Sequence, residues 1–140
     1  MVTASFHDMA PRISLTLDTT HASELAEFWK FALGYVDEPP PAPFKTRQEW
    51  VASFDLPDDD GDGAWLIDPD GVGPRLSLLD VPEPKTAKNR LHVDLKVGGS
   101  WAHVTAEAER LTGAGASVLR VDQGHHIVMA DPEGNEFCLC

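Results

Sequence analysis

The sequence predicts an α+β fold made of two similar βαβββ modules, and three observations support it. The chain has 140 residues, which suits one compact domain or two very small ones. A strand-like alternation followed by a helical stripe begins at residue 12 and again at residue 90. A DP(D/E)G turn also occurs twice, at residues 68–71 and 131–134. An internal duplication of this kind determines the architecture, because each copy is one supersecondary unit.

The first module begins with a strand and a helix. Residues 12–19 alternate apolar and polar side chains, which is typical of a half-buried strand. Thr20 is the expected N-cap of a helix that runs to about Leu33, because apolar residues then recur at helical spacing. Gly34 stands where a left-handed residue ends a helix.

A loop and three strands are expected to complete the first module. Four prolines between residues 37 and 44 exclude a regular element there. Strand-like runs follow at residues 49–56, 64–67 and 75–81, with turn-rich segments between them. The acidic segment 58–63 matches the start of a calcium loop, but its twelfth position is Pro69, so we interpret it as a solvated turn.

The second module repeats this order. Residues 90–97 alternate like the first strand, and Ser100 is the expected N-cap of a helix to about Thr112. Three short strands are expected in the remainder, at residues 117–121, 125–130 and 135–140. The apolar strand faces should pack against the two helices, and the polar faces should line a shared concave space.

We expect the two modules to form a single domain over residues 1–140. Module one covers residues 12–82, a linker covers 83–89, and module two covers 90–140. Neither half is long enough to bury a sufficient core alone. Because each module leaves a curved sheet edge and a half-open pocket, we also expect a homodimer.

Composition and charge exclude several classes of protein. Eleven Lys and Arg residues against 23 Asp and Glu residues leave a formal net charge of −12. Such a surface repels phosphate backbones and anionic lipids, so we expect neither nucleic-acid nor membrane binding. The first residues also lack the basic start and apolar core of a secretion signal. These features indicate a cytoplasmic protein with a small-molecule ligand, and the acidic charge weakly favours a cationic or neutral one.

The layout resembles the vicinal oxygen chelate superfamily, which includes glyoxalase I, extradiol dioxygenases, and fosfomycin and bleomycin resistance proteins. The resemblance rests on the helix segment FWKFALGY (28–35), the two DP(D/E)G turns, the linker VPEPK (81–85), and the segments KNRLHVD (88–94) and MADPEGNEFC (129–138). It covers nearly the whole chain and is most similar to the glyoxalase-like subgroup. It implies two βαβββ modules curled around a cavity, and it is less specific for the reaction than for the fold.

In metal-dependent members of that superfamily, ligands come from the first and last strand of each module. The resemblance places these positions at Ser14, Ser77, His92 and Cys138. Only His92 is the expected residue type, whereas a catalytic divalent site generally needs three protein ligands. We therefore expect no cofactor and no conventional metal centre, with His92 as the ligand if a divalent metal is present.

His92 is the best candidate for a catalytic residue, since it shares the polar face of its strand with Asp94. It could act as a general base or bind ligand, or it could be a structural histidine bonded to a neighbouring strand. Cys138 is interpreted mainly as a wall residue of the cavity, because nothing in the sequence provides the positive charge that activates a thiol.

Aromatic residues in the expected strands of module one suit a planar ligand, with core packing as the alternative. The full predicted pocket combines them with the polar strand faces: Ser14, Thr16, Trp50, Phe54, Trp65, Ser77, His92, Asp94 and Cys138. We expect a small-molecule-binding, glyoxalase-like protein that holds a partly aromatic metabolite or drug. The alternative is a lyase, isomerase or dioxygenase-type enzyme that uses His92 as base or metal ligand.

Overall fold

The computed structural model describes residues 10–54 and 63–140. Two runs of elements follow one another along the chain. They are β1 (Leu15–Thr19), α1 (Ala22–Leu33), β2 (Val36–Asp37), α2 (Arg47–Ala52), β3 (Gly63–Ile67), β4 (Leu76–Asp80), β5 (Val93–Leu95), α3 (Trp101–Gly113), β6 (Ser117–Asp122), β7 (His126–Ala130) and β8 (Glu136–Leu139).

The strands form two four-stranded sheets with the same internal order. The first sheet has the order β1-β4-β3-β2 and the second has the order β5-β8-β7-β6. In each sheet the first and last strands of the module pair in parallel, and all other pairs are antiparallel. This repetition confirms the predicted α+β fold of two modules.

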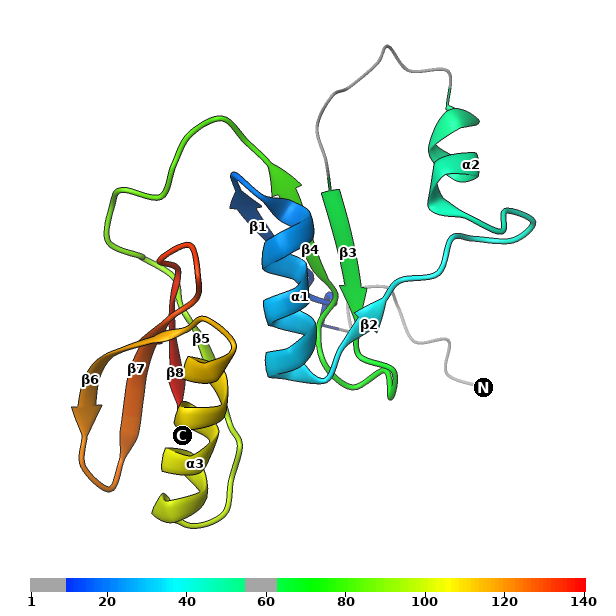
Figure 1. The fold of residues 1–140 in the computed structure, drawn as a ribbon. Coiled ribbons are helices and arrows are strands. Elements are labelled where there is room, and N and C mark those ends of the chain that lie inside the picture. The colour runs from blue at the N-terminus through cyan, green and yellow to red at the C-terminus, as the bar shows by residue number, and fades with distance from the viewer. Residues whose placement is uncertain (1–9, 55–62) are drawn as a thin grey trace.

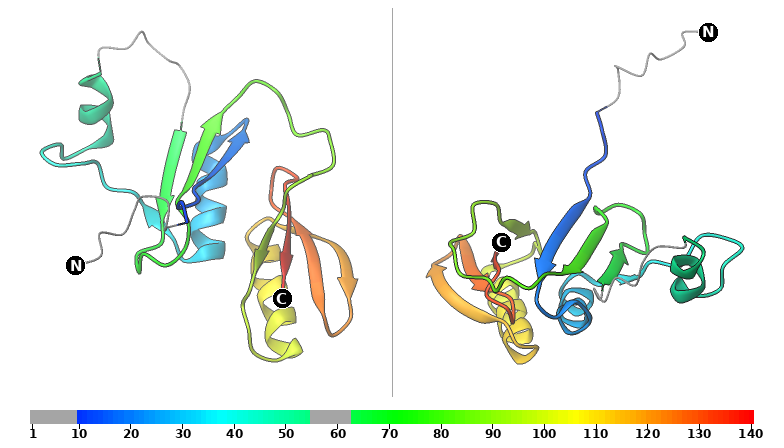
Figure 2. Two further views of the ribbon diagram at one scale, coloured as in Figure 1. Left: turned by 180° about the vertical axis from the view of Figure 1, so that it is seen from behind. Right: turned by 90° about the horizontal axis from the view of Figure 1, so that it is seen from above.

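Each sheet is covered by one helix on one face only. α1 lies in front of the first sheet and α3 in front of the second (Figure 1). Seen from behind, both sheets lie in front of their helices, so their open faces look to the same side (Figure 2). The two sheets do not close into a barrel, and each open face is therefore a separate surface within one chain.

The modules share one hydrophobic core, because α1 also contacts the second sheet. The rings of Phe28 and Trp29 lie 6.0 and 5.3 Å, centroid to centroid, from the ring of Phe137 in β8. Phe137 is fully buried, as are Leu66 and Leu78 in the first sheet. The two halves thus depend on each other for burial of their apolar faces.

The helix ends explain where the chain turns. Gly34 has a φ of 70° and its N–H donates to the carbonyl of Lys30, as the sequence predicts. Ser100 caps α3 through a hydrogen bond from the His103 N–H. The predicted cap of α1 is wrong by one residue: His21 holds that position, because the side chain of Thr20 donates instead to Glu133.

The strand predicted over residues 49–56 is wrong where the structure describes it. This segment contains α2, whose N-terminus is fixed by a capping box. The Glu49 N–H donates to the hydroxyl of Thr46 at 3.1 Å, and the Glu49 carboxylate accepts from the Thr46 N–H. The short strand β2 takes the expected place in the sheet, while residues 55–62, with most of the calcium-loop-like segment, lie outside the described residues.

No helix in the described part of the chain is long and apolar enough to cross a membrane.

Candidate functional site

One row of side chains crosses the open face of the second sheet from edge to edge. Strand register places Arg120 of β6 opposite Val128 of β7, Val128 opposite Cys138 of β8, and Cys138 opposite Asp94 of β5. Directly opposed residues on paired strands present their side chains to the same face. The face therefore brings together a guanidinium, an apolar side chain, a thiol and a carboxylate.

His92 lies next to Asp94, at the β5 end of this row. The ring Nδ1 of His92 lies 3.1 Å from a carboxylate oxygen of Asp94. The polar atoms that His92, Asp94 and Cys138 can offer to a ligand all lie within 4.8 Å of one another. His92 immediately precedes β5, which begins at Val93, so it lies just before the paired residues of that strand. Three of the predicted pocket residues are thus adjacent.

The thiol of Cys138 is held in its protonated form. Its partial burial raises its pKa, and the Asp94 carboxylate beside it adds to this effect, while Arg120 acts in the opposite direction. A nucleophilic cysteine needs a lowered pKa. The surroundings of Cys138 therefore disfavour covalent catalysis and suit a neutral hydrogen-bonding group.

A pocket of about 350 Å³ lies over this face. Its apolar wall includes Val128 and Leu119, and its polar wall includes the imidazoles of His92 and His126. The remaining lining residues are Lys88, Arg120, Glu136, Phe137 and Cys138. A mixed wall of this kind is typical of sites that hold a small organic molecule by burial and orient it by a few polar contacts.

Glu136 of the pocket has an ion-pair partner, whereas Asp122, among the described residues, lies near a histidine only. Lys88 donates a hydrogen bond to Glu136, which lowers the pKa of Glu136 and keeps it ionised. Asp122 lies 3.7 Å from the ring Nδ1 of His126. The basic linker residue Lys88 thus pairs with a carboxylate of the second sheet.

The predicted residues of module one lie on the other sheet. Register places Thr16 opposite Ser77 and Ser77 opposite Trp65 on the open face of the first sheet. Ser77 is buried, and its hydroxyl accepts a hydrogen bond of 3.1 Å from Arg75, which in turn pairs with Glu38. Because the sheets do not close, this face and the His92 cluster are separate within one chain.

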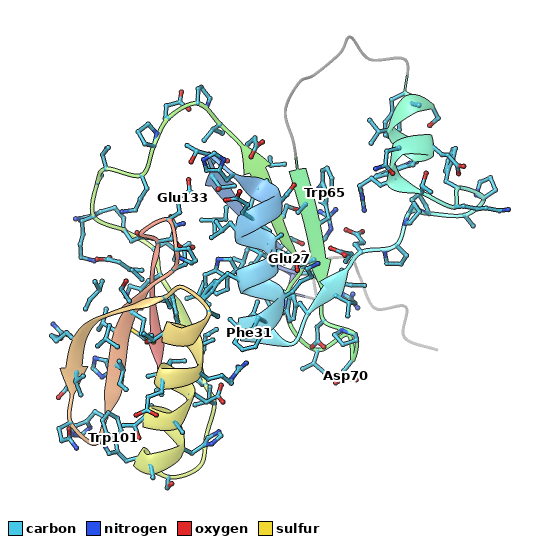
Figure 3. The ribbon with its side chains drawn as sticks, viewed as in Figure 1. Glu27, Phe31, Trp65, Asp70, Trp101 and Glu133 are labelled. Carbon is cyan, nitrogen blue, oxygen red and sulfur yellow. The ribbon has the colours of Figure 1, made fainter. Side chains whose placement is uncertain are left out.

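Trp50 and Phe54 do not lie on strands of the first sheet. Their rings pack edge to face at 5.1 Å on α2 and just after it. The guanidinium of Arg47 lies 4.9 Å from the ring centroid of Trp50 and 4.2 Å from that of Trp65. Trp65 stands on the side of β3 that looks toward α2 (Figure 3). These three aromatics thus anchor α2 to the sheet, and Trp65 alone belongs to a strand.

Seven lining residues of the pocket were not predicted as site residues, and four of them are polar or charged. His126 and Glu136 could have been found, because strand alternation places them on the same face as Val128 and Cys138. Lys88 comes from the linker and is found only through its partner Glu136. Arg120 depends on an irregularity in β6 that simple alternation misses.

The residues of the second sheet fit a divalent metal better than the four positions implied by the superfamily. The hydroxyl of Ser77 already accepts a hydrogen bond from the Arg75 guanidinium. Ser14 is exposed and, like Ser77, belongs to the first module. In contrast, an imidazole, a thiol and a carboxylate are the ligands that zinc commonly takes, and three of them leave a position open. Among the described residues, His92, Asp94 and Cys138 are therefore the group that would hold a metal.

The chain matches a family model described as a glyoxalase-like domain over residues 14–140. A comparison with curated proteins gives no match. The fosfomycin resistance protein FosX from Mesorhizobium loti has a similar fold, with 11% identity, a TM-score of 0.66 and coverage of 94% of this chain and 90% of that one. An enzyme of the glyoxalase/bleomycin resistance/dioxygenase family from Burkholderia phytofirmans PsJN has 13% identity, a TM-score of 0.61 and coverage of 90% and 94%.

FosX from Listeria monocytogenes, in a structure with Mn(II) and dihydroxypropylphosphonic acid, has 13% identity, a TM-score of 0.62 and coverage of 94% and 91%. Likeness at these identities shows the fold and not the reaction. The family model covers the repeated modules and both turns that carry the resemblance in the sequence. The chain therefore belongs to the glyoxalase-like domain family, within the vicinal oxygen chelate superfamily.

Proposed function

We propose that this protein binds a small, partly aromatic organic molecule in the pocket on the open face of the second sheet. The observation that carries the proposal is the pocket of about 350 Å³ that adjoins the His92–Asp94–Cys138 cluster. Leu119 and Val128 supply the apolar wall on which a ring could lie. His92 and Cys138 supply the hydrogen-bonding groups that would orient it.

Binding without a conventional metal mechanism is supported by the first sheet. The Arg75 guanidinium donates a hydrogen bond to the hydroxyl of Ser77, at the position where metal-dependent relatives would place a carboxylate. The Ser77 oxygen therefore already has a hydrogen-bonding partner, and Arg75 is itself held by Glu38. A binding protein needs no catalytic residue, and the protonated thiol of Cys138 agrees with such a role.

Mapping by ¹H–¹⁵N NMR with a library of aromatic fragments tests this proposal. We expect fragments to shift the amides of His92, Val128 and Cys138 and to leave those of the first sheet unchanged. Val128→Trp should abolish these shifts by filling the pocket. Val72→Trp is the matched control, since Val72 is 89% exposed in a turn far from the pocket residues in sequence and sheet. A library that shifts no pocket amide would contradict the proposal.

A second candidate is a metal-dependent lyase, isomerase or dioxygenase-type enzyme. It is favoured by the three ligand atoms that lie within 4.8 Å of one another. Metal analysis of the purified protein separates the two candidates: near-stoichiometric metal that is lost in both His92→Ala and Cys138→Ser would contradict metal-free binding. In a metal-free protein, a turnover assay of His92→Ala tests the imidazole as a base, whose loss should cost about a hundredfold or more.

A second copy of the chain is proposed as the partner that covers the open sheet faces. Leu79 is 39% exposed on the open face of the first sheet, although leucine in a central strand is usually buried. β1 and β5 each have one unpaired edge in the described part of the chain. Unpaired edges and exposed apolar side chains are both surfaces that another chain can cover.

A further inference from the structure

Arg120 reaches the pocket because of a β-bulge in β6. Ser117 and Val118 pair with Ala130 and Met129, but the next registered pair is Arg120 with Val128. If the ladder were regular after Val118, Arg120 would stand opposite Ile127, which is buried on the face that α3 covers. The extra residue therefore turns the guanidinium to the open face. Bulges of this kind frequently re-aim a side chain beside a functional site.

The guanidinium of Arg120 forms no ion pair with the described carboxylates near the pocket. Glu136 pairs with Lys88, and Asp122 lies beside His126. Arg120 makes no hydrogen bond or ion pair with any residue in ranges 10–54 and 63–140, and it is exposed. The N–H donors of the Arg120 guanidinium are thus available to a ligand, in a chain whose net charge is −12.

We infer that the pocket takes a small organic anion, whose carboxylate, phosphonate or phosphate group binds Arg120 while its nonpolar part lies against Leu119 and Val128. This inference rests on the proposed function and names its ligand class. The planar guanidinium offers parallel N–H donors that match two oxygens of such a group. Val128 separates Arg120 from Cys138 in the strand row, so the anion and the thiol would lie on opposite sides of an apolar side chain.

An anionic ligand is opposite in charge to the cationic ligand that the acidic composition of the whole sequence favours. Net charge acts over long distances and is screened by salt, whereas a bound group interacts most strongly with charges within a few ångströms. The excess of carboxylates over the whole chain therefore does not decide what the pocket binds. The groups in direct contact with the ligand decide it, and Arg120 lines the pocket together with Leu119 and Val128.

Three probes of similar shape and different charge test this inference: phenylphosphonate, benzamide and benzamidine. Each is titrated into the wild-type chain and followed by the amides of Val128 and Cys138. We expect phenylphosphonate to bind tightest, and Arg120→Gln to weaken it about tenfold or more. Arg12→Gln removes the same charge from an exposed residue outside the pocket and should leave its affinity unchanged.

The outcomes separate this inference from the proposed function. If benzamide or benzamidine binds at the pocket as well as phenylphosphonate does, the ligand class is wrong and small-molecule binding stands. If phenylphosphonate binds equally to wild type and Arg120→Gln, Arg120 is not the anion group and the inference is overturned. If none of the three probes shifts a pocket amide, both proposals are contradicted.

Discussion

The indole nitrogen of Trp29 donates a hydrogen bond of 3.1 Å to the carboxylate of Asp131, across the boundary between the two modules. Asp131 is almost completely buried. The same carboxylate accepts from the side-chain amide of Asn135 and from the backbone N–H groups of Glu133 and Asn135. This carboxylate therefore shapes the second DP(D/E)G turn and attaches it to α1 at the same time.

Trp29→Phe should destabilise the chain by removing this link. The variant keeps an aromatic ring in the core but loses the donor to a buried carboxylate, which costs about 1–3 kcal/mol. Urea unfolding followed by circular dichroism measures the change in the free energy of unfolding. Trp101→Phe is the control, since Trp101 makes no hydrogen bond from its indole within the described residues. Equal losses in the two variants would show that the Trp29–Asp131 bond adds nothing.

Stability at acid pH should depend on Glu133. Burial acts to raise the pKa of Glu133, but hydrogen bonds from Thr19 and Thr20 outweigh it and hold the pKa below the usual value. The folded chain therefore binds this proton more weakly than the unfolded chain does. The stabilisation is complete above the unfolded pKa and is lost as the pH falls through the folded pKa.

We therefore expect the free energy of unfolding of the wild type to fall more steeply below about pH 5 than that of Glu133→Gln. The difference between the two should shrink as the pH is lowered. Urea denaturation at a series of pH values measures it, with Glu83→Gln in the exposed linker as control. Parallel curves for wild type and Glu133→Gln would contradict the prediction.

Arg47→Gln should loosen α2. No residue of α2 is buried, and its attachment depends on the Arg47 guanidinium between Trp50 and Trp65 together with the contact of Arg47 to Glu38. Removing a cation from an aromatic pair costs about 1 kcal/mol. Hydrogen exchange of the α2 amides should accelerate severalfold. Gln48→Ala changes an exposed neighbour and should leave the exchange rates unaltered.

The proposed dimer predicts a mass of about twice 15.3 kDa in sedimentation equilibrium. If the partner covers the open face of the first sheet, Leu79→Lys should shift the equilibrium strongly toward monomer. Val72→Lys introduces the same charge at a turn residue that is 89% exposed, and it should not. A wild-type chain that sediments as a monomer at all concentrations would contradict the dimer.

The fold was predictable because the duplication is visible in the residues themselves. Alternation in residues 12–19 and 90–97 gives β1 and β5, and the glycine after Leu33 marks the end of α1. The failure came in residues 49–56, whose aromatic and β-branched residues are typical of a strand. The capping box of Thr46 and Glu49 favours a helix there, and a local signal at the start of an element outweighed the composition of its interior.

The site was predictable only in part. His92, Asp94 and Cys138 come together because the parallel pairing of β5 and β8 follows directly from the duplicated topology. The separation of Ser77 from His92 could not be read from alternation, which shows which side a residue faces but not whether two sheets close. Arg120 was missed because Val118 and Leu119 are consecutive apolar residues, and the phase of alternation changes between them and Asp122.

The bulge in β6 makes the polarity of the pocket depend on the number of residues in the turn between β6 and β7. Its hairpin turn fixes the pair of Asp122 with His126, and every side chain between the turn and the bulge follows from that pair. A one-residue insertion in the turn would exchange the two faces of this half-strand, moving Arg120 toward α3 and Val121 into the pocket. Relatives could thus gain or lose an anion-binding group through a single insertion or deletion, with the arginine codon itself unchanged.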